Sequence, residues 1–351
     1  PVPIPVPPFS VIIPVALDVR SDRYDFEFQH TLSAWETVRV VWGLGARQDE
    51  NLSPAYLGTT QTVTEHLYRL FANVEWRATQ RLLVNAGAMY EKYDITGGDV
   101  SPRLALNYHF LPGHTVRASI SRATRQPVAF EERSNERVCA DPACTFFDQI
   151  YLSSGQLRPE RIDSSEIGYL GRITPAINVD LRLFRDQVFD LIGDYKPPYP
   201  ADLVDGKIFD FRNGGKATLF GTEMQLQYRP KRETRIILGM ANTQIESNDF
   251  DRPYSTSVPR NNVSLLALQD LSPAWQVSSA FYYQDEMRFI GGDPLGALRR
   301  LDLRLARRFR LADARGEAAI VFQNVLGAQT AYSTETLNAQ AGYFTLSLQF
   351  R

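Results

Sequence analysis

The last residues of the chain, FTLSLQFR, alternate between apolar and polar without interruption. Phe344, Leu346, Leu348 and Phe350 occupy every second position, and threonine, serine and glutamine stand between them. Successive side chains of a β-strand point to opposite faces, so the segment predicts a strand with one apolar and one polar side. Such a strand belongs either to a water-soluble sandwich or to the wall of a membrane barrel.

The same alternation recurs along nearly the whole chain, in about fifteen segments. Tyr24, Phe26 and Phe28 form one face of an early segment, and LRRLDLRLARRF repeats the pattern near the C-terminus. The N-terminal segment VIIPVALDVR is one further candidate, in which Pro14 favours an edge or bulge position. Helical periodicity is almost absent, so we predict an all-β fold of about 15–16 antiparallel strands.

The connections between these segments differ in length in a regular way. Every second connection is very short, as in LSAWE, ATQR, LPGH, TPA and RPKRE, and those between them are long and polar. A sandwich shows no such rule, whereas outer-membrane barrels join their strands by tight periplasmic turns and long external loops. We therefore predict a transmembrane up-and-down β-barrel, apolar toward lipid and charged toward the lumen. The C-terminal strand is expected to close it by pairing with the first strand.

Composition agrees with a barrel and excludes other classes of protein. The 351 residues carry a net charge of −2, which gives no sign of a nucleic-acid partner. No apolar run of about 18 residues is present, which excludes a membrane helix but not barrel strands of about 9–11 residues. Sixteen tyrosines and twenty phenylalanines suit strands and the aromatic girdles of barrels.

We expect residues 1–23 to form a Pro-rich N-terminal segment with a possible first strand, and residues 24–351 to form the barrel. The opening PVPIPVPPFS lacks the charged and apolar regions of a signal peptide. An exported chain of this kind is expected to be a mature form or a fragment.

The two cysteines, Cys139 and Cys144, lie close together in RVCADPACTF. A short loop with a central Asp-Pro favours a local disulfide, and hence an oxidising compartment, over two free thiols. The four histidines are scattered along the chain, so the sequence indicates no metal site and no cofactor.

The stretch 126–161 is the longest connection, and loops of this length usually have a function. Two arginines stand where the preceding strand meets it and are candidates to attract an anionic ligand, although both also suit a charged rim. The aromatic residues of this loop and of the next long loop are candidate ligand contacts, with a packing lid as the alternative. These candidates are Arg122, Arg125, Phe130, Phe146, Phe147, Tyr151, Tyr195 and Tyr199.

Several phrases, in their order and spacing, resemble the barrel of TonB-dependent outer-membrane receptors over about residues 24–351. They include LFANVEWRATQRLLVNAGAMYEKYD, SPRLALNYHFLPGHTVRASISRATRQP, LRPERIDSSEIGYLGRI, NGGKATLFGTEMQLQY, VPRNNVSLLAL and FQNVLG. The resemblance implies an outer-membrane location, contact with lipid, and insertion by the barrel-assembly machinery. It also implies a barrel of about 22 strands around a plug, and this sequence shows neither the plug nor the first strands.

No catalytic signature is present, so we expect no enzymatic activity. The leading hypothesis is import of a scarce small ligand such as a ferric siderophore, driven by TonB through a plug that these residues do not contain. The absence of a histidine in the loop after TRQP disfavours haem. A passive pore or an envelope scaffold is the alternative, and a secreted soluble β-protein is a more distant one.

Overall fold

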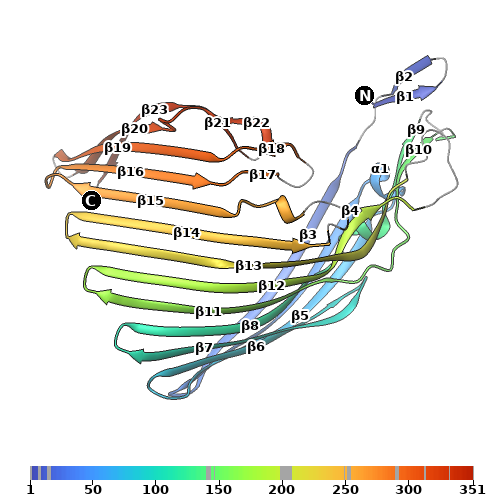
Figure 1. Ribbon diagram of the computed structural model, residues 1–351. Helices are drawn as coiled ribbons and strands as arrows, with labels where there is room; N and C mark the ends of the chain where they lie inside the picture. The colour runs from blue at the N-terminus through green and yellow to red at the C-terminus, as the bar shows by residue number, and fades with distance from the viewer. Residues whose placement is uncertain are drawn as a thin grey trace.

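The computed structural model describes residues 2–6, 9–13, 17–139, 144–145, 147–197, 208–248, 250, 254–288, 292–311, 314–331 and 333–350. Most of them belong to one antiparallel sheet of 15 strands, in which each strand pairs with the sheet strands before and after it in the chain (Figure 1). The all-β prediction is confirmed. The sheet consists of β3 (Arg20–Trp35), β4 (Val38–Leu52), β5 (Val63–Arg77), β6 (Leu82–Tyr93), β7 (Gly97–Leu111), β8 (His114–Arg125), β11 (Glu160–Thr174), β12 (Ile177–Tyr195), β13 (Asp210–Lys231), β14 (Thr234–Ser247), β15 (Asn261–Asp270), β16 (Trp275–Gln284), β19 (Leu298–Leu311), β20 (Ala314–Gln323) and β23 (Ala341–Gln349).

The remaining elements are short and lie before the sheet or in its long connections. The helices among them have at most five residues. These elements are β1 (Val2–Val6), β2 (Phe9–Ile13), α1 (Pro54–Leu57), α2 (Ala129–Arg133), β9 (Asn135–Cys139), β10 (Phe147–Leu152), the 3-10 helix η1 (Tyr254–Thr256), β17 (Met287–Arg288), β18 (Pro294–Leu295), β21 (Gln329–Ala331) and β22 (Ser333–Asn338).

Long and short connections lie at opposite ends of the sheet. Figure 1 shows the tight turns along the left and lower edge, and the elements α1, β9 and β10 at the other end. This arrangement follows from an antiparallel meander, in which alternate connections return to the same edge. The predicted rule of connection lengths is therefore a property of the fold, and it brings all the long loops together at one end.

The two faces of the sheet differ as the alternation predicted. In β23, the side chains of Phe344 and Leu346 are 65% and 59% exposed, and they share an outer face with Ile320 of β20 and Leu305 of β19. The opposite, inner face carries charged side chains such as Arg304 of β19 and Glu317 of β20. A broad exposed apolar face on a sheet of this size matches contact with lipid rather than water.

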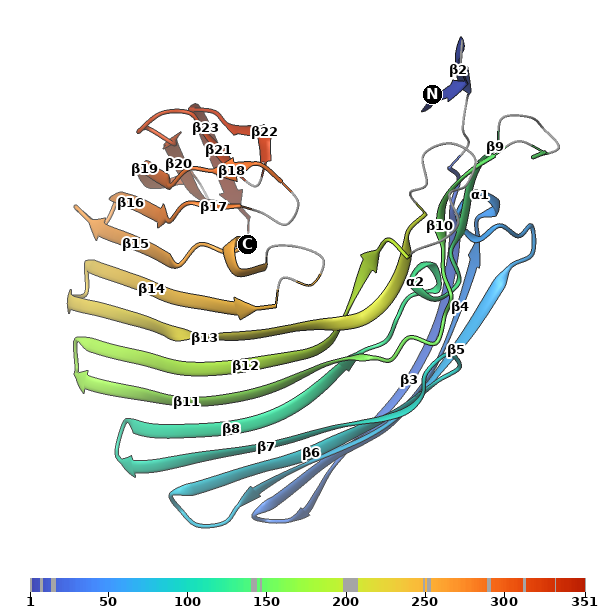
Figure 2. The same ribbon diagram turned by 45° about the vertical axis from the view of Figure 1, so that its right-hand side comes forward.

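The two end strands of the sheet do not pair with each other among the described residues. β3 and β23 form opposite edges of a curved, open sheet (Figure 2), so the pairing of the last strand with the first that we expected is not found. Strand direction excludes the antiparallel closure that we expected. In an antiparallel meander of 15 strands, the first and the last strand run the same way and cannot form an antiparallel pair.

The described part of the N-terminal segment does not supply a sixteenth strand of the large sheet. Phe9–Ile13 forms β2, which pairs with β1 in a separate two-stranded sheet, and Val2 faces Ile13 in that pair. Pro14 lies outside the described residues. The large sheet begins at Arg20, slightly before the expected boundary at residue 24. In the described ranges, no helix is long and apolar enough to cross a membrane.

Candidate functional site

The inner face of the sheet contains a recess of about 640 Å³. Its floor is made of two neighbouring rows of cross-strand partners that run from β12 to β19. One row joins Arg182, Glu223, Ala241, Asn262, Gln284 and Leu298, and the other joins Asp180, Gln225, Gly239, Ser264, Tyr282 and Arg300. A volume of this size is within the range of small-molecule sites.

The recess exists because the residues in the middle of both rows are small. Gly239, Ala241 and Ser264 stand between longer side chains and leave the space above them open. An added Cβ at Gly239 would meet only the hydroxyl oxygen of Ser264, at 2.6 Å, and that hydroxyl can rotate away. A larger residue at Gly239 would therefore extend into the recess without disturbing the backbone.

Ion pairs line the side of the recess formed by β8, β12 and β13. The Nη2 atom of Arg182 lies 2.9 Å from Oε1 of Glu223, and Nη2 of Arg117 lies 2.9 Å from Oδ1 of Asp180. All four side chains are partly exposed, so these pairs add little to the free energy of unfolding. They instead present a wall of donors and acceptors to a polar ligand.

The rim of the recess comes from long connections. Met287 of β17 and Leu295 of β18 belong to a small hairpin, and Thr330 and Asn338 come from the β21–β22 hairpin. Asp285 lies just beyond β16 and accepts hydrogen bonds from the Tyr283 hydroxyl at 2.7 Å and from the Asn261 side chain at 2.7 Å. These hydrogen bonds, that from Tyr283 first, lower the pKa of Asp285, so an anionic carboxylate is held at the rim.

The two arginines predicted as anion attractors lie on different faces of the sheet. Arg122 shares the outer face with Ile120, and its guanidinium binds both carboxylate oxygens of Asp163 at 2.6 and 3.1 Å. Arg125 ends β8 and binds Glu160 and Glu131, with its Nε atom 2.6 Å from Oε2 of Glu160. Both charges are matched by carboxylates, which agrees with the charged-rim alternative.

Two of the predicted aromatic residues of the long loop, Phe130 and Tyr151, lie in one cluster with aromatic residues from elsewhere in the chain. The ring centroid of Phe130 lies 5.2 Å from that of Tyr151, 5.6 Å from Tyr56 and 5.7 Å from Phe211. Tyr151 also stacks on Phe211 at 5.3 Å. The rings thus pack two connections and the start of β13 against one another at the loop end of the sheet, which agrees with the packing-lid alternative.

Asp210 joins the long loop to the start of β13, and no sequence pattern pointed to it. Its side chain is 1% exposed and accepts hydrogen bonds from the amides of Ser154 at 3.0 Å and Phe211 at 2.6 Å. The hydroxyl of Tyr195 donates to Asp210 at 3.3 Å, and the Tyr195 ring lies under the guanidinium of Arg212 at 4.4 Å. Tyr195 therefore supports the loops from a position beside the aromatic cluster.

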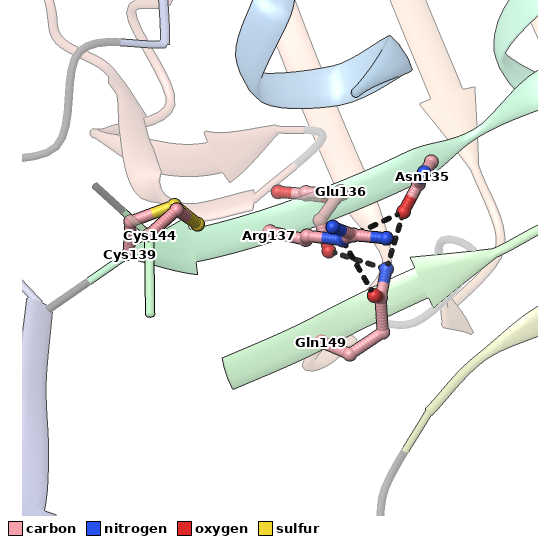
Figure 3. Close-up of a disulfide and its surroundings, with 6 residues drawn as sticks. All are labelled: Asn135, Glu136, Arg137, Cys139, Cys144 and Gln149. Carbon is pink, nitrogen blue, oxygen red and sulfur yellow. Dashed lines mark hydrogen bonds between the residues drawn. A yellow bond between two sulfur atoms is a disulfide. The ribbon is translucent and has the colours of Figure 1, made fainter. Parts of the chain in front are cut away.

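Cys139 and Cys144 form the predicted disulfide at the tip of the β9–β10 hairpin (Figure 3). Behind it, the Gln149 side chain reaches from β10 to β9 and donates to the carbonyl oxygen of Glu136 at 3.0 Å. Phe147 packs against Arg137, whose guanidinium carbon lies 4.8 Å from the ring centroid. The other two predicted contacts, Phe146 and Tyr199, lie outside the described residues.

Glu136 is buried in this hairpin, with 8% of its surface exposed. Burial raises the pKa of its carboxyl above the ordinary value of 4.5, because the charged form loses its hydration. The stability of the hairpin therefore depends on pH through this carboxyl group.

The recess residues were not among those predicted from the sequence. Alternation places Arg182, Glu223 and Gly239 on the polar face of their strands, but it does not say which polar residues of different strands are neighbours. That depends on the register of each pair. Among the described residues, no group of three or more potential metal ligands is present.

The chain belongs to a known family of outer-membrane β-barrels. The model of the TonB dependent receptor-like β-barrel matches residues 14–351, nearly the whole sequence. Members of this family are receptors and transporters of the outer membrane and are not enzymes. No curated protein matches the sequence.

Solved structures of similar fold include siderophore receptors and an iron transporter. A mutant of the ferric enterobactin receptor PfeA of Pseudomonas aeruginosa has a TM-score of 0.77 at 13% identity, over 94% of this chain and 54% of that chain. The siderophore receptor PirA of Acinetobacter baumannii has a TM-score of 0.72 at 14% identity, over 93% of this chain and 54% of that chain. The FrpB iron transporter of Neisseria meningitidis has a TM-score of 0.72 at 10% identity, over 93% of this chain and 55% of that chain.

These likenesses show the fold alone, because the identities are low. The present chain spans slightly more than half the length of each of these structures. An open sheet of 15 strands agrees with a chain that corresponds to part of such a barrel.

Proposed function

We propose that this chain forms part of an outer-membrane receptor that imports a scarce small ligand, a ferric siderophore being the leading candidate. TonB would supply the energy through a plug domain inside the barrel. The observation that carries the proposal is the recess of about 640 Å³ on the inner face, beneath hairpins of the long connections. A ligand that passed the external loops would meet this recess on its way through the barrel.

The chemistry of the recess suits a polar, multidentate ligand. Arg182 and Glu223 offer donors and acceptors side by side, and Tyr282 and Met287 add apolar surface. Because each arginine is paired with a carboxylate, the recess does not select for a highly charged anion. Recognition would rest on hydrogen bonds and shape, with small residues such as Gly239 setting the depth.

The test is uptake of ⁵⁵Fe by cells that express the receptor, with one catecholate, one hydroxamate and one carboxylate ferric chelate as probes. We expect energy-dependent uptake of at least one chelate, abolished by an agent that collapses the proton-motive force. Gly239→Trp should lower binding and uptake of that chelate by about tenfold, a loss that corresponds to about 1.4 kcal/mol.

Thr345→Trp is the matched control, since Thr345 lies exposed on the inner face of β23 and away from the recess. This variant should import normally. Uptake that continues after the proton-motive force collapses would favour a passive pore. Failure to bind any of the three chelates would exclude the siderophore proposal, and equal uptake by both tryptophan variants would exclude the recess as its site.

A further inference from the structure

The outer face of the sheet carries a groove of about 520 Å³ that import does not use. It crosses β7, β8, β11 and β12, which are neighbours in the sheet (Figure 1). Its walls are branched aliphatic side chains, and two small residues, Ala118 and Ser165, form its floor. The wall residues are Leu104, Leu106, Ile120, Ile167 and Leu183.

The groove ends where the apolar belt of the outer face ends. Along β12, the outer face reads Val179, Leu181 and Leu183, and then changes to Arg185 and Gln187. Along β8, the change comes between Ile120 and Arg122. The groove thus runs through the apolar belt and opens at a polar border on the side of the long loops, which in outer-membrane barrels is the external side.

The polar border is positively charged. The guanidinium of Arg185 is exposed and makes no ion pair or hydrogen bond with any residue that the structure describes. Arg122 and Arg161 both lie against Asp163, at 2.6 and 3.6 Å. Arg122 and Arg161 therefore share one carboxylate and Arg185 has none, so the positive charge left over lies at the mouth of an apolar groove.

We propose that this groove is a binding site for a phosphorylated lipid of the outer leaflet. One acyl chain would lie between Ile120 and Leu183, over Ala118 and Ser165. Its phosphate would accept hydrogen bonds from the free guanidinium of Arg185, with Arg122 and Arg161 adding positive charge.

Charge decides between this occupant and others. A neutral lipid would fill the groove but would leave Arg185 without a partner, whereas a guanidinium binds phosphate oxygens in a two-pronged geometry. An apolar protein segment would need an acidic residue at the level of Arg185 to pair with its guanidinium. Phosphate at the headgroup border is the chemistry that the surrounding lipid itself supplies.

The experiment compares two lipids on the protein purified from outer membranes into a neutral detergent. The probes are lipid A with two phosphates and the same lipid with its phosphates removed, and binding is measured by native mass spectrometry. We expect the phosphorylated form to bind more tightly, by about fivefold for each guanidinium it contacts. Arg185→Gln should remove about fivefold of this preference, and Arg185→Lys should retain most of it.

Two further variants separate charge from shape and from misfolding. Ala118→Phe fills the floor of the groove and should weaken both lipids alike. Arg307→Gln removes an exposed outer-face arginine that lies over Trp275 at the opposite end of the belt, and it should change neither. Equal binding of the two lipids by the unaltered protein, an undiminished preference in Arg185→Gln, or unchanged binding in Ala118→Phe would overturn the proposal. This outcome is independent of which ligand the receptor imports.

Discussion

The pKa values of two carboxyl groups at the loop end of the sheet shift in opposite directions. Hydrogen bonds from Tyr283 and Asn261 lower the pKa of the partly exposed Asp285, whereas burial in the β9–β10 hairpin raises the pKa of Glu136. For an acid whose pKa is raised by folding, the folded state binds the proton more tightly than the unfolded state. The hairpin is then most stable below the ordinary pKa of 4.5 and loses stability as the pH rises through the raised value.

We expect Glu136→Gln to remove this pH dependence. Amide-exchange protection of β9 and β10 should fall between pH 4 and 7 in the unaltered protein and should remain constant in the variant. Glu27→Gln is the control. Glu27 lies exposed on β3, so its loss should leave the pH dependence of protection in β9 and β10 unchanged. If the pH dependence of protection persisted in Glu136→Gln, it would have to arise from another titratable group.

The strands are the elements that the alternation described correctly. In β23, Leu346 faces outward and Ser347 faces inward opposite Glu317, as the sequence pattern predicted. Adjacent residues of one strand therefore experience lipid and the barrel interior, and the same substitution at the two positions should have very different effects.

Leu346→Arg is expected to lower the free energy of unfolding by about 2–4 kcal/mol, because a guanidinium on the lipid face must enter the apolar layer. Ser347→Arg should change it by less than about 1 kcal/mol, since its side chain enters the polar interior. Urea unfolding in lipid vesicles measures both. Equal destabilisation by the two variants would contradict the assignment of the faces.

At the scale of the whole molecule, the loops form one assembly. Phe130 joins its own connection to Tyr56 of another connection and to Phe211 at the start of β13, and it also contacts Tyr151. Backbone hydrogen bonds between Phe209 and the Ile150–Leu152 segment, at 2.8 and 2.9 Å, reinforce the junction. The cluster thus packs these segments against one another at the loop end of the sheet.

Phe130→Ala should loosen these segments together. We expect it to cost about 2 kcal/mol of local stability, less than the ~3–5 kcal/mol of a fully buried phenylalanine. Amide exchange should accelerate at Leu57, Leu152 and Phe209, while the sheet remains protected. Phe147→Ala, which removes a ring outside the cluster, should affect only its own hairpin. Acceleration confined to the 126–158 loop would show that these segments open independently.

The features that could be predicted from the sequence are those that depend on local patterns. The alternation around Phe344 and Leu346, the rule of connection lengths and the close spacing of Cys139 and Cys144 gave the strands, their two faces, the barrel class and the disulfide. Each depends on residues within one segment or on the order of segments. For the same reason these features did not depend on knowing how any two strands pair.

Tertiary structure alone decided which residues of different strands and loops become neighbours. Register places Gly239 beside Ser264 to hollow the recess, and it places Arg185 at the mouth of the outer groove. The loops turned the predicted ligand contacts Phe130 and Tyr151 toward each other, and strand direction left β3 and β23 as open edges. Shifting the register of one strand by two residues preserves every pattern of alternation but moves each of these contacts, so the sequence pattern does not contain them.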